Sequence, residues 1–249
     1  MSKITFLGTA SAVPDATHHN AHFILESGMR KVLVDCSGNP VVRLKEAGID
    51  PLALTDVILT HFHPDHVSGL PLLLMDLWLM GREQSLVLHG LKADLERARG
   101  MLDLFDWDKW TGCYPVVFNA LGSAEYIPVN TDEELTIVAS SVCHMIPAIG
   151  LRMTLPEGIV AYSTDTGPCD SVIRLAQDAN VLIHEASGSM AGHTSAAEAG
   201  EVAAQAGVET LVSIHYPPEA DPLELAAEAG EAFSGDVLVA EDLMALELN

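Results

Sequence analysis

The sequence contains few basic residues: 12 lysines and arginines stand against 35 aspartates and glutamates, which gives a formal net charge of −23. A surface of this sign repels polyanions at long range, so nucleic acid is not expected as the main partner, and a small-molecule substrate is favoured. Aromatic residues are also scarce, at 5% of the 249 residues, although the hydrophobic fraction of 49% is ordinary for a globular chain. No linker or repeat divides the sequence, so we expect one domain over residues 1–249.

Cysteine is rare as well. The four cysteines form no C-x-x-C pair, and their scatter suits neither a disulfide framework nor a thiolate zinc site. Reduced thiols in a cytoplasmic protein are therefore expected. Long hydrophobic runs are missing too: the longest, residues 67–80, is interrupted by polar residues, glycine and proline, so no membrane span is expected. The apolar run after Met1 is too short for a signal peptide.

One stretch is dense in metal-ligand side chains. Residues 60–66 read Thr-His-Phe-His-Pro-Asp-His, and they follow an apolar run at 57–59 that predicts a buried strand. So many polar side chains at one strand end are costly to desolvate unless a cation compensates. Histidine and aspartate are ligands that zinc takes in open catalytic sites. The stretch therefore predicts a metal site, the alternative being a solvated histidine-rich turn.

Apolar runs and helix-start signals predict an α/β protein in which layered sheets carry helices on their outer faces. Strands are expected over residues 3–7, 23–25, 32–35, 57–60, 85–89, 114–118, 135–139, 158–162, 181–184, 210–215 and 237–240. Helices are expected over residues 39–47, 68–80, 91–104, 171–178, 195–206 and 223–233. Residues 119–134 are expected to form a loop.

Four later polar sites share one feature, because each follows an apolar strand. His144, Asp165, His184-Glu185 and His215 all stand at such positions. Ligands of layered α/β folds bind beyond the carboxyl ends of the strands. This rule brings His144, Asp165 and His215 close to residues 61–66 and predicts a set of ligands for two metals.

The order of these residues resembles the metallo-β-lactamase superfamily. The motif reads His61-x-His63-x-Asp65-His66, followed by His144, Asp165 and His215. The resemblance covers nearly the whole chain and includes the loop at 8–12, the strand-end Asp35 and the closing segment 240–242. The segments His184-Glu185-Ala186 and Gly192-His193-Thr194-Ser195 are similar to the branch that contains tRNase Z and related phosphodiesterases. The resemblance implies a four-layered αβ/βα sandwich.

The resemblance also implies a role for each matching residue. The expected metal ligands are His61, His63 and His144 for one ion, Asp65, His66 and His215 for the other, and Asp165 as the bridge. Two divalent ions, zinc or alternatively manganese or iron, would hold a hydroxide between them. Asp65 would also orient this hydroxide, and His193 would act as general acid. Glu185 would orient a histidine, with His193 as the candidate.

Two departures from the branch bear on function. Thr164 stands where the branch usually has glycine, and the long basic arm with which tRNase Z grips tRNA is missing. We expect a phosphodiesterase that acts on a small phosphodiester such as a cyclic nucleotide. Alternatives are a lactone, thioester or sulfate-ester hydrolase of the same fold, a tRNA 3′-processing endonuclease, or a non-catalytic metal-binding protein. A homodimer is expected only by analogy with relatives. The segment 107–110 either closes over the site or covers a core edge.

Overall fold

The computed structural model describes residues 1–248 and contains two seven-stranded sheets. In order across the first sheet, the strands are β14 (Ala245–Leu248), β1 (Ser2–Gly8), β2 (His22–Ser27), β3 (Arg30–Val34), β4 (Asp56–Ile58), β5 (Leu86–Leu91) and β6 (Val116–Leu121). In order across the second sheet, they are β13 (Asp236–Val239), β12 (Thr210–Ile214), β11 (Val181–Glu185), β10 (Gly158–Tyr162), β9 (Ile149–Leu155), β8 (Thr136–Ser141) and β7 (Ile127–Thr131).

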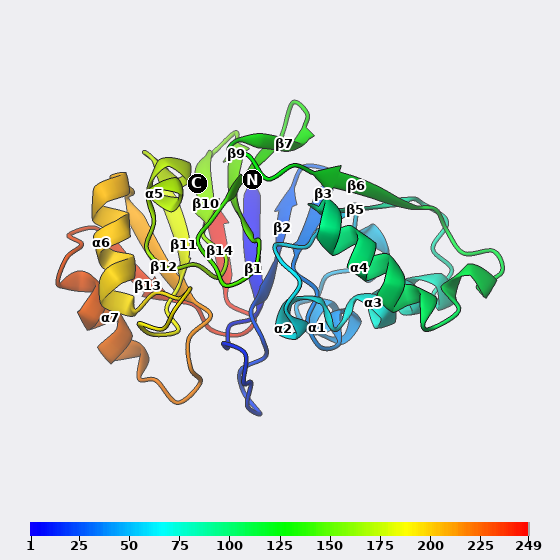
Figure 1. Ribbon diagram of the computed structural model, residues 1–249, viewed down its shortest axis with the longest axis horizontal. Coiled ribbons are helices and arrows are strands. Elements are labelled where there is room, and N and C mark those ends of the chain that lie inside the picture. Colours follow the sequence, from blue (N-terminus) through cyan, green and yellow to red (C-terminus); the bar gives the residue numbers. More distant parts are fainter. Residues whose placement is uncertain (249) are drawn as a thin grey trace.

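Helices cover the outer face of each sheet (Figure 1). The first sheet carries α1 (Pro40–Glu46), α2 (Pro64–Val67), α3 (Leu70–Leu79) and α4 (Lys92–Asp103). The second carries α5 (Asp170–Ala176), α6 (Ala196–Ala206) and α7 (Pro222–Gly230). Two 3₁₀ turns, η1 (Pro51–Ala53) and η2 (Trp107–Lys109), complete the elements. The predicted α/β sandwich of four layers is confirmed.

The main core lies between the two sheets. Phe23 of β2 contacts Phe6 and Tyr162 edge to face, with ring centroids 6.2 and 5.0 Å away. Separate apolar clusters fill the space between the first sheet and α1, α3 and α4, and between the second sheet and α5 to α7. Close packing of three layers of apolar side chains holds the strand ends in fixed positions.

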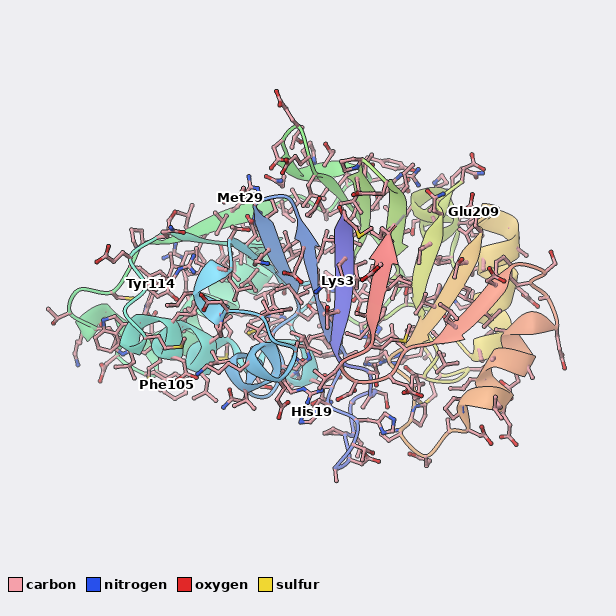
Figure 2. The ribbon with its side chains drawn as sticks, turned by 180° about the vertical axis from the view of Figure 1, so that it is seen from behind. Lys3, His19, Met29, Phe105, Tyr114 and Glu209 are labelled. Carbon is pink, nitrogen blue, oxygen red and sulfur yellow. The ribbon has the colours of Figure 1, made fainter. Side chains whose placement is uncertain are left out.

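The strands that precede the expected ligands end at one edge of the sandwich. β3 and β4 pair in parallel in the first sheet, and β10, β11 and β12 do so in the second. In Figure 1 this is the lower edge, where α2 lies. The loop after β1 extends from the same edge, with His19 on it (Figure 2). Parallel strands thus deliver their following loops to one place.

Four sequence-based assignments need correction. The expected loop over 119–134 contains β7, and neither β9 nor β14 was predicted. The helix expected over 68–80 is confirmed by α3, whereas the short helix α2 within the histidine motif was not predicted.

The aromatic segment 107–110 covers a core edge, which is one of the two alternatives expected from the sequence. Trp110 stacks on Trp78 of α3 with the ring planes 2° apart, and Trp107 packs edge-on against Phe118 of β6. Among residues 1–248, every helix falls short of the length and apolar content needed to span a bilayer.

Candidate metal centre

Three histidines face one another across a short gap. The Nε2 atoms of His61 and His144 each lie 3.1 Å from Nδ1 of His63. Two nitrogens bound to one tetrahedral zinc at about 2.0–2.1 Å are separated by about 3.3 Å, so this spacing suits a shared cation. An oxygen of Asp165 lies 3.9 Å from His61 Nε2 and completes a group of four.

A second group lies on the other side of Asp165. Oδ2 of Asp165 is 3.5 Å from His66 Nε2 and 3.4 Å from His215 Nε2. Asp65 Oδ2 is 3.5 Å from the same atom of His215. Within each of the two groups, all ligand atoms lie within 4.8 Å of one another. Because Asp165 belongs to both groups, its carboxylate has the position of a bridge.

The buried atoms at this centre lack the partners that burial requires. His66 Nε2, His215 Nε2 and Asp165 Oδ1 accept or donate no hydrogen bond within the part of the chain that the structure describes. All three side chains are at most 2% exposed. Buried polar groups are normally satisfied, and leaving one unpaired is unfavourable. The donor set of imidazole nitrogens and carboxylate oxygens therefore fits two divalent cations.

The electrostatics of the second group point the same way. Burial would raise the pKa of Asp165, but His215 and His66 hold this pKa well below its ordinary value. Burial would lower the pKa of His66, but Asp165 and Asp35 raise it well above its ordinary value. Without a cation, protons on the histidines supply the positive charge that the carboxylates need. A bound cation takes over that role and displaces the protons.

Contacts outside the ligand set orient the imidazole rings. Asp35 Oδ2 lies 2.8 Å from His66 Nδ1, and the carbonyl of Gly192 lies 2.8 Å from His144 Nδ1. Ser187 Oγ lies 2.7 Å from His215 Nδ1. Each contact occupies one ring nitrogen and turns the other toward the centre. Of these three residues, only Asp35 could be singled out from the sequence, because it follows a strand; the contacts of Ser187 and Gly192 depend on tertiary structure.

The backbone is strained where it holds this centre. Asp35, Thr164 and His215 have φ angles of +61°, +54° and +52°, which is uncommon for residues other than glycine. For the β-branched Thr164 the conformation is especially unfavourable, and this is the position where the branch usually has glycine. The Thr164 hydroxyl donates a 2.9 Å hydrogen bond to Thr60 Oγ1, which in turn donates to Asp35. The hydroxyl network thus holds a turn that backbone preference opposes.

His193 stands beside the two metal groups and is joined to Glu185. Glu185 Oε1 lies 2.9 Å from His193 Nδ1, which is the contact expected from the sequence. This hydrogen bond raises the pKa of His193, although partial burial acts in the opposite direction. The His193 ring is parallel to that of His215 at a centroid distance of 6.0 Å. Ser195 and Glu198 form the predicted capping box of α6, which fixes the approach to His193.

Comparison with known proteins supports this arrangement. Residues 2–233 match the family described as anti-Pycsar protein Apyc1. The chain belongs to this Apyc1 family. It is also similar to a ribonuclease Z of Methanothermobacter thermautotrophicus, with 27% identity over all of this chain and 97% of the relative.

Solved structures share the fold of this Apyc1 family member. The metallo-β-lactamase fold protein YhfI from Bacillus subtilis superposes with a TM-score of 0.85 at 26% identity, covering 98% of both chains. The short form of human tRNase Z superposes with a TM-score of 0.82 at 21% identity, covering 99% of both chains. The chain therefore has the metallo-β-lactamase fold.

Within this Apyc1 family member, the structure brings all seven expected ligands to one edge of the sandwich, with His193 and Glu185 beside them. His22, which lacks a ligand-like spacing in the sequence, lies in β2, is buried and is directed to the carbonyl of Asn20. His89, also outside the ligand set, contacts Asp56.

Proposed function

We propose that the chain is a binuclear phosphodiesterase that acts on a small phosphodiester. The observation that carries the proposal is the position of Asp165 between two complete ligand groups, with a hydrogen-bonded imidazole beside them. Two divalent cations, zinc in this proposal with manganese or iron as alternatives, would supply an activated water and neutralise charge on the phosphoryl group. This chemistry suits in-line displacement at phosphorus.

The side chains around the centre then have distinct tasks. His61, His63 and His144 would hold one cation, and His66 and His215 would hold the other; Asp165 belongs to both groups. Asp65 is 14% exposed and contacts His215 through one carboxylate oxygen. Asp65 would be a ligand of the second cation, and its carboxylate would orient the attacking water by accepting a hydrogen bond from it. Asp35 contacts Nδ1 of His66, which leaves Nε2 of that ring free to bind the cation.

His193 acts on the leaving group. Its Nδ1 is occupied by Glu185, so Nε2 is the atom that delivers a proton. The side chain is 12% exposed and can therefore reach a bound substrate. A proton placed on the leaving oxygen converts an alkoxide into an alcohol, which lowers the barrier most when the alkoxide is a poor leaving group.

A second candidate function is tRNA 3′ processing, because the relative from Methanothermobacter is named ribonuclease Z and a tRNase Z shares the fold. That reaction uses the same metal centre. The net charge of −23 counts against it, since tRNA binding relies on lysine and arginine contacts to phosphates.

The test compares substrates with different leaving groups. Metal-loaded protein is assayed with a 3′,5′-cyclic nucleotide, bis(4-nitrophenyl) phosphate and a precursor tRNA. We expect turnover of both small diesters. His193→Ala should slow the cyclic nucleotide by about 10²–10⁴-fold and the nitrophenyl ester much less, because nitrophenolate needs little protonation. Cleavage of the precursor tRNA without turnover of either small diester would favour the second candidate, and equal slowing of both esters would contradict the role of His193.

A further inference from the structure

A cavity of about 380 Å³ opens directly beside the metal centre. His193 and His215 form the wall nearest the ligands. The other walls come from residues 11–13 after β1, from Ser187 and Met190, and from residues 217–219 after β12. This volume lies within the range of about 300–1,000 Å³ found for small-molecule sites.

The outer walls of this cavity are mainly apolar. Val13 is 75% exposed and Met190 is 61% exposed, and both line the cavity. Ala12, Pro217 and Pro218 add further apolar surface. Exposed apolar side chains grouped beside a polar metal centre are typical of a ligand-binding surface. These side chains suit a ligand group that has an apolar face.

Apart from His193, positive charge is missing from the same walls. Among the described residues that line the cavity, none is lysine or arginine, and Glu219 contributes an exposed carboxylate. None of the 12 basic residues of the chain follows Arg174. Arg43 is engaged elsewhere, because it donates to Asp242 at 2.8 Å and to the carbonyl of Leu7 at 2.7 Å. An anionic group in the cavity would therefore meet a carboxylate and no lysine or arginine.

The position of His193 assigns a role to this cavity. In the proposed reaction, water forms a new P–O bond, the bond to the leaving oxygen breaks, and His193 gives that oxygen a proton. The alcohol that departs must therefore lie against His193. We propose, on the basis of the proposed phosphodiesterase function, that this cavity is a leaving-group subsite which selects an uncharged, apolar-faced alcohol, with Glu219 rejecting anionic ones.

The test uses two diesters that differ by one charge on the leaving group. Phenyl 4-nitrophenyl phosphate and phenyl 3-carboxy-4-nitrophenyl phosphate both release a nitrophenolate, so the nitro ring occupies the subsite. For the metal-loaded wild type, kcat/KM should favour the neutral ester. Glu219→Lys should reduce this preference by about tenfold, and Glu219→Gln by less, because removing and then reversing one nearby charge changes the interaction stepwise.

Glu228→Lys is the matched control, since Glu228 is an exposed residue of α7 outside the cavity and the change in net charge is the same. It should leave the preference unchanged. The proposed subsite would be overturned if Glu219→Lys and Glu228→Lys changed the kcat/KM preference equally. It would also be overturned if the wild type showed no preference for the neutral ester.

A binding measurement separates this proposal from the proposed function. NMR titration with 4-nitrophenol and 3-carboxy-4-nitrophenol needs no turnover. Binding that favours the phenol without the carboxylate, and a loss of this preference in Glu219→Lys, would support the subsite. This holds even if neither ester were hydrolysed, and in that case only the phosphodiesterase function would fail. Equal binding of the two phenols, with no effect of Glu219→Lys, would overturn the subsite whatever the turnover.

Discussion

Glu185 has the largest influence on the pKa of His193. Glu185 is fully buried at the end of β11, and its Oε1 accepts from the backbone N–H of Thr166 as well as contacting His193 Nδ1. Because Thr166 follows Asp165, the same side chain connects the proposed proton donor to the proposed bridging ligand. Glu185 therefore positions His193 and keeps its imidazolium form stable.

We predict that Glu185→Gln moves the pH profile of the enzyme. The carboxylate raises the pKa of His193, so the acid form persists to a higher pH than for a free imidazole. Activity that needs this acid form is lost as pH rises through that pKa. Replacing the carboxylate with an amide lowers the pKa, so the decline of kcat should begin at a lower pH.

The measurement is kcat against pH for a substrate with an alkoxide leaving group. Glu201→Gln, an exposed change on α6, is the matched control and should keep the wild-type profile. An unchanged profile in Glu185→Gln would show that His193 is not the acid.

At this scale the sequence indicated the proposed ligands better than their supports. His61, His63, Asp65 and His66 stand together in one motif, and the remaining ligands follow apolar strands. Among the supports, Asp35 and Glu185 follow strands, but two others carry no such signal: Gly192 acts through its backbone carbonyl, and Ser187 resembles any loop serine until the fold brings it to His215.

Among the elements, α6 connects the site to the outer helical layer. It begins at the capping box that follows His193, and it packs against α7. The contact is close at Gly200, where an added Cβ would lie 2.2 Å from the carbonyl oxygen of Ala229. Helices α6 and α7 can lie this close together only because Gly200 has no side chain.

We predict that Gly200→Ala destabilises the protein although alanine favours helix. Helix propensity alone would stabilise it by about 1 kcal/mol, whereas overpacking against the α7 backbone costs about 1–3 kcal/mol. Gly100 of α4 is the matched control, because no atom lies within 4 Å of its added Cβ. Gly100→Ala should therefore be stabilising by about 0.5–1 kcal/mol. Urea unfolding measures both, and stabilisation of equal size in the two variants would contradict the packing argument.

Prediction of the elements from sequence failed mainly at sheet edges. β7 and β14 are edge strands that pair on one side only, and β7 contains Pro128. Short edge strands owe their conformation to the neighbouring strand more than to their own residues. The interior strands β4, β11 and β12 have continuous apolar runs, which is why periodicity located them.

Over the whole molecule, negative charge dominates. The 35 acidic residues outnumber the 12 basic ones, and several basic side chains are already paired, as Arg30 is with Asp56 and Asp132. Like charges spread over a compact surface repel one another and weaken the folded state. We propose that the same charge keeps polyanions away from the metal centre.

We predict that sodium chloride raises the melting temperature. Raising the concentration from 0.02 to about 0.3 M shortens the range of electrostatic interactions to several ångströms and screens the repulsion. For a chain of this size, each kcal/mol gained raises Tm by about 2–4 °C. Differential scanning calorimetry at fixed pH and metal content measures the effect. Potassium chloride should act equally, and a Tm that falls with either salt would mean that attractive ion pairs outweigh repulsion.

The metal centre itself is tested most directly by anomalous diffraction from crystals of the zinc-loaded protein. Two peaks are predicted in each chain, about 3.5–4 Å apart. One should be bound by His61, His63 and His144, the other by Asp65, His66 and His215, with the carboxylate of Asp165 contacting both. A single peak at full occupancy, or two peaks that do not share Asp165, would contradict the two-metal centre.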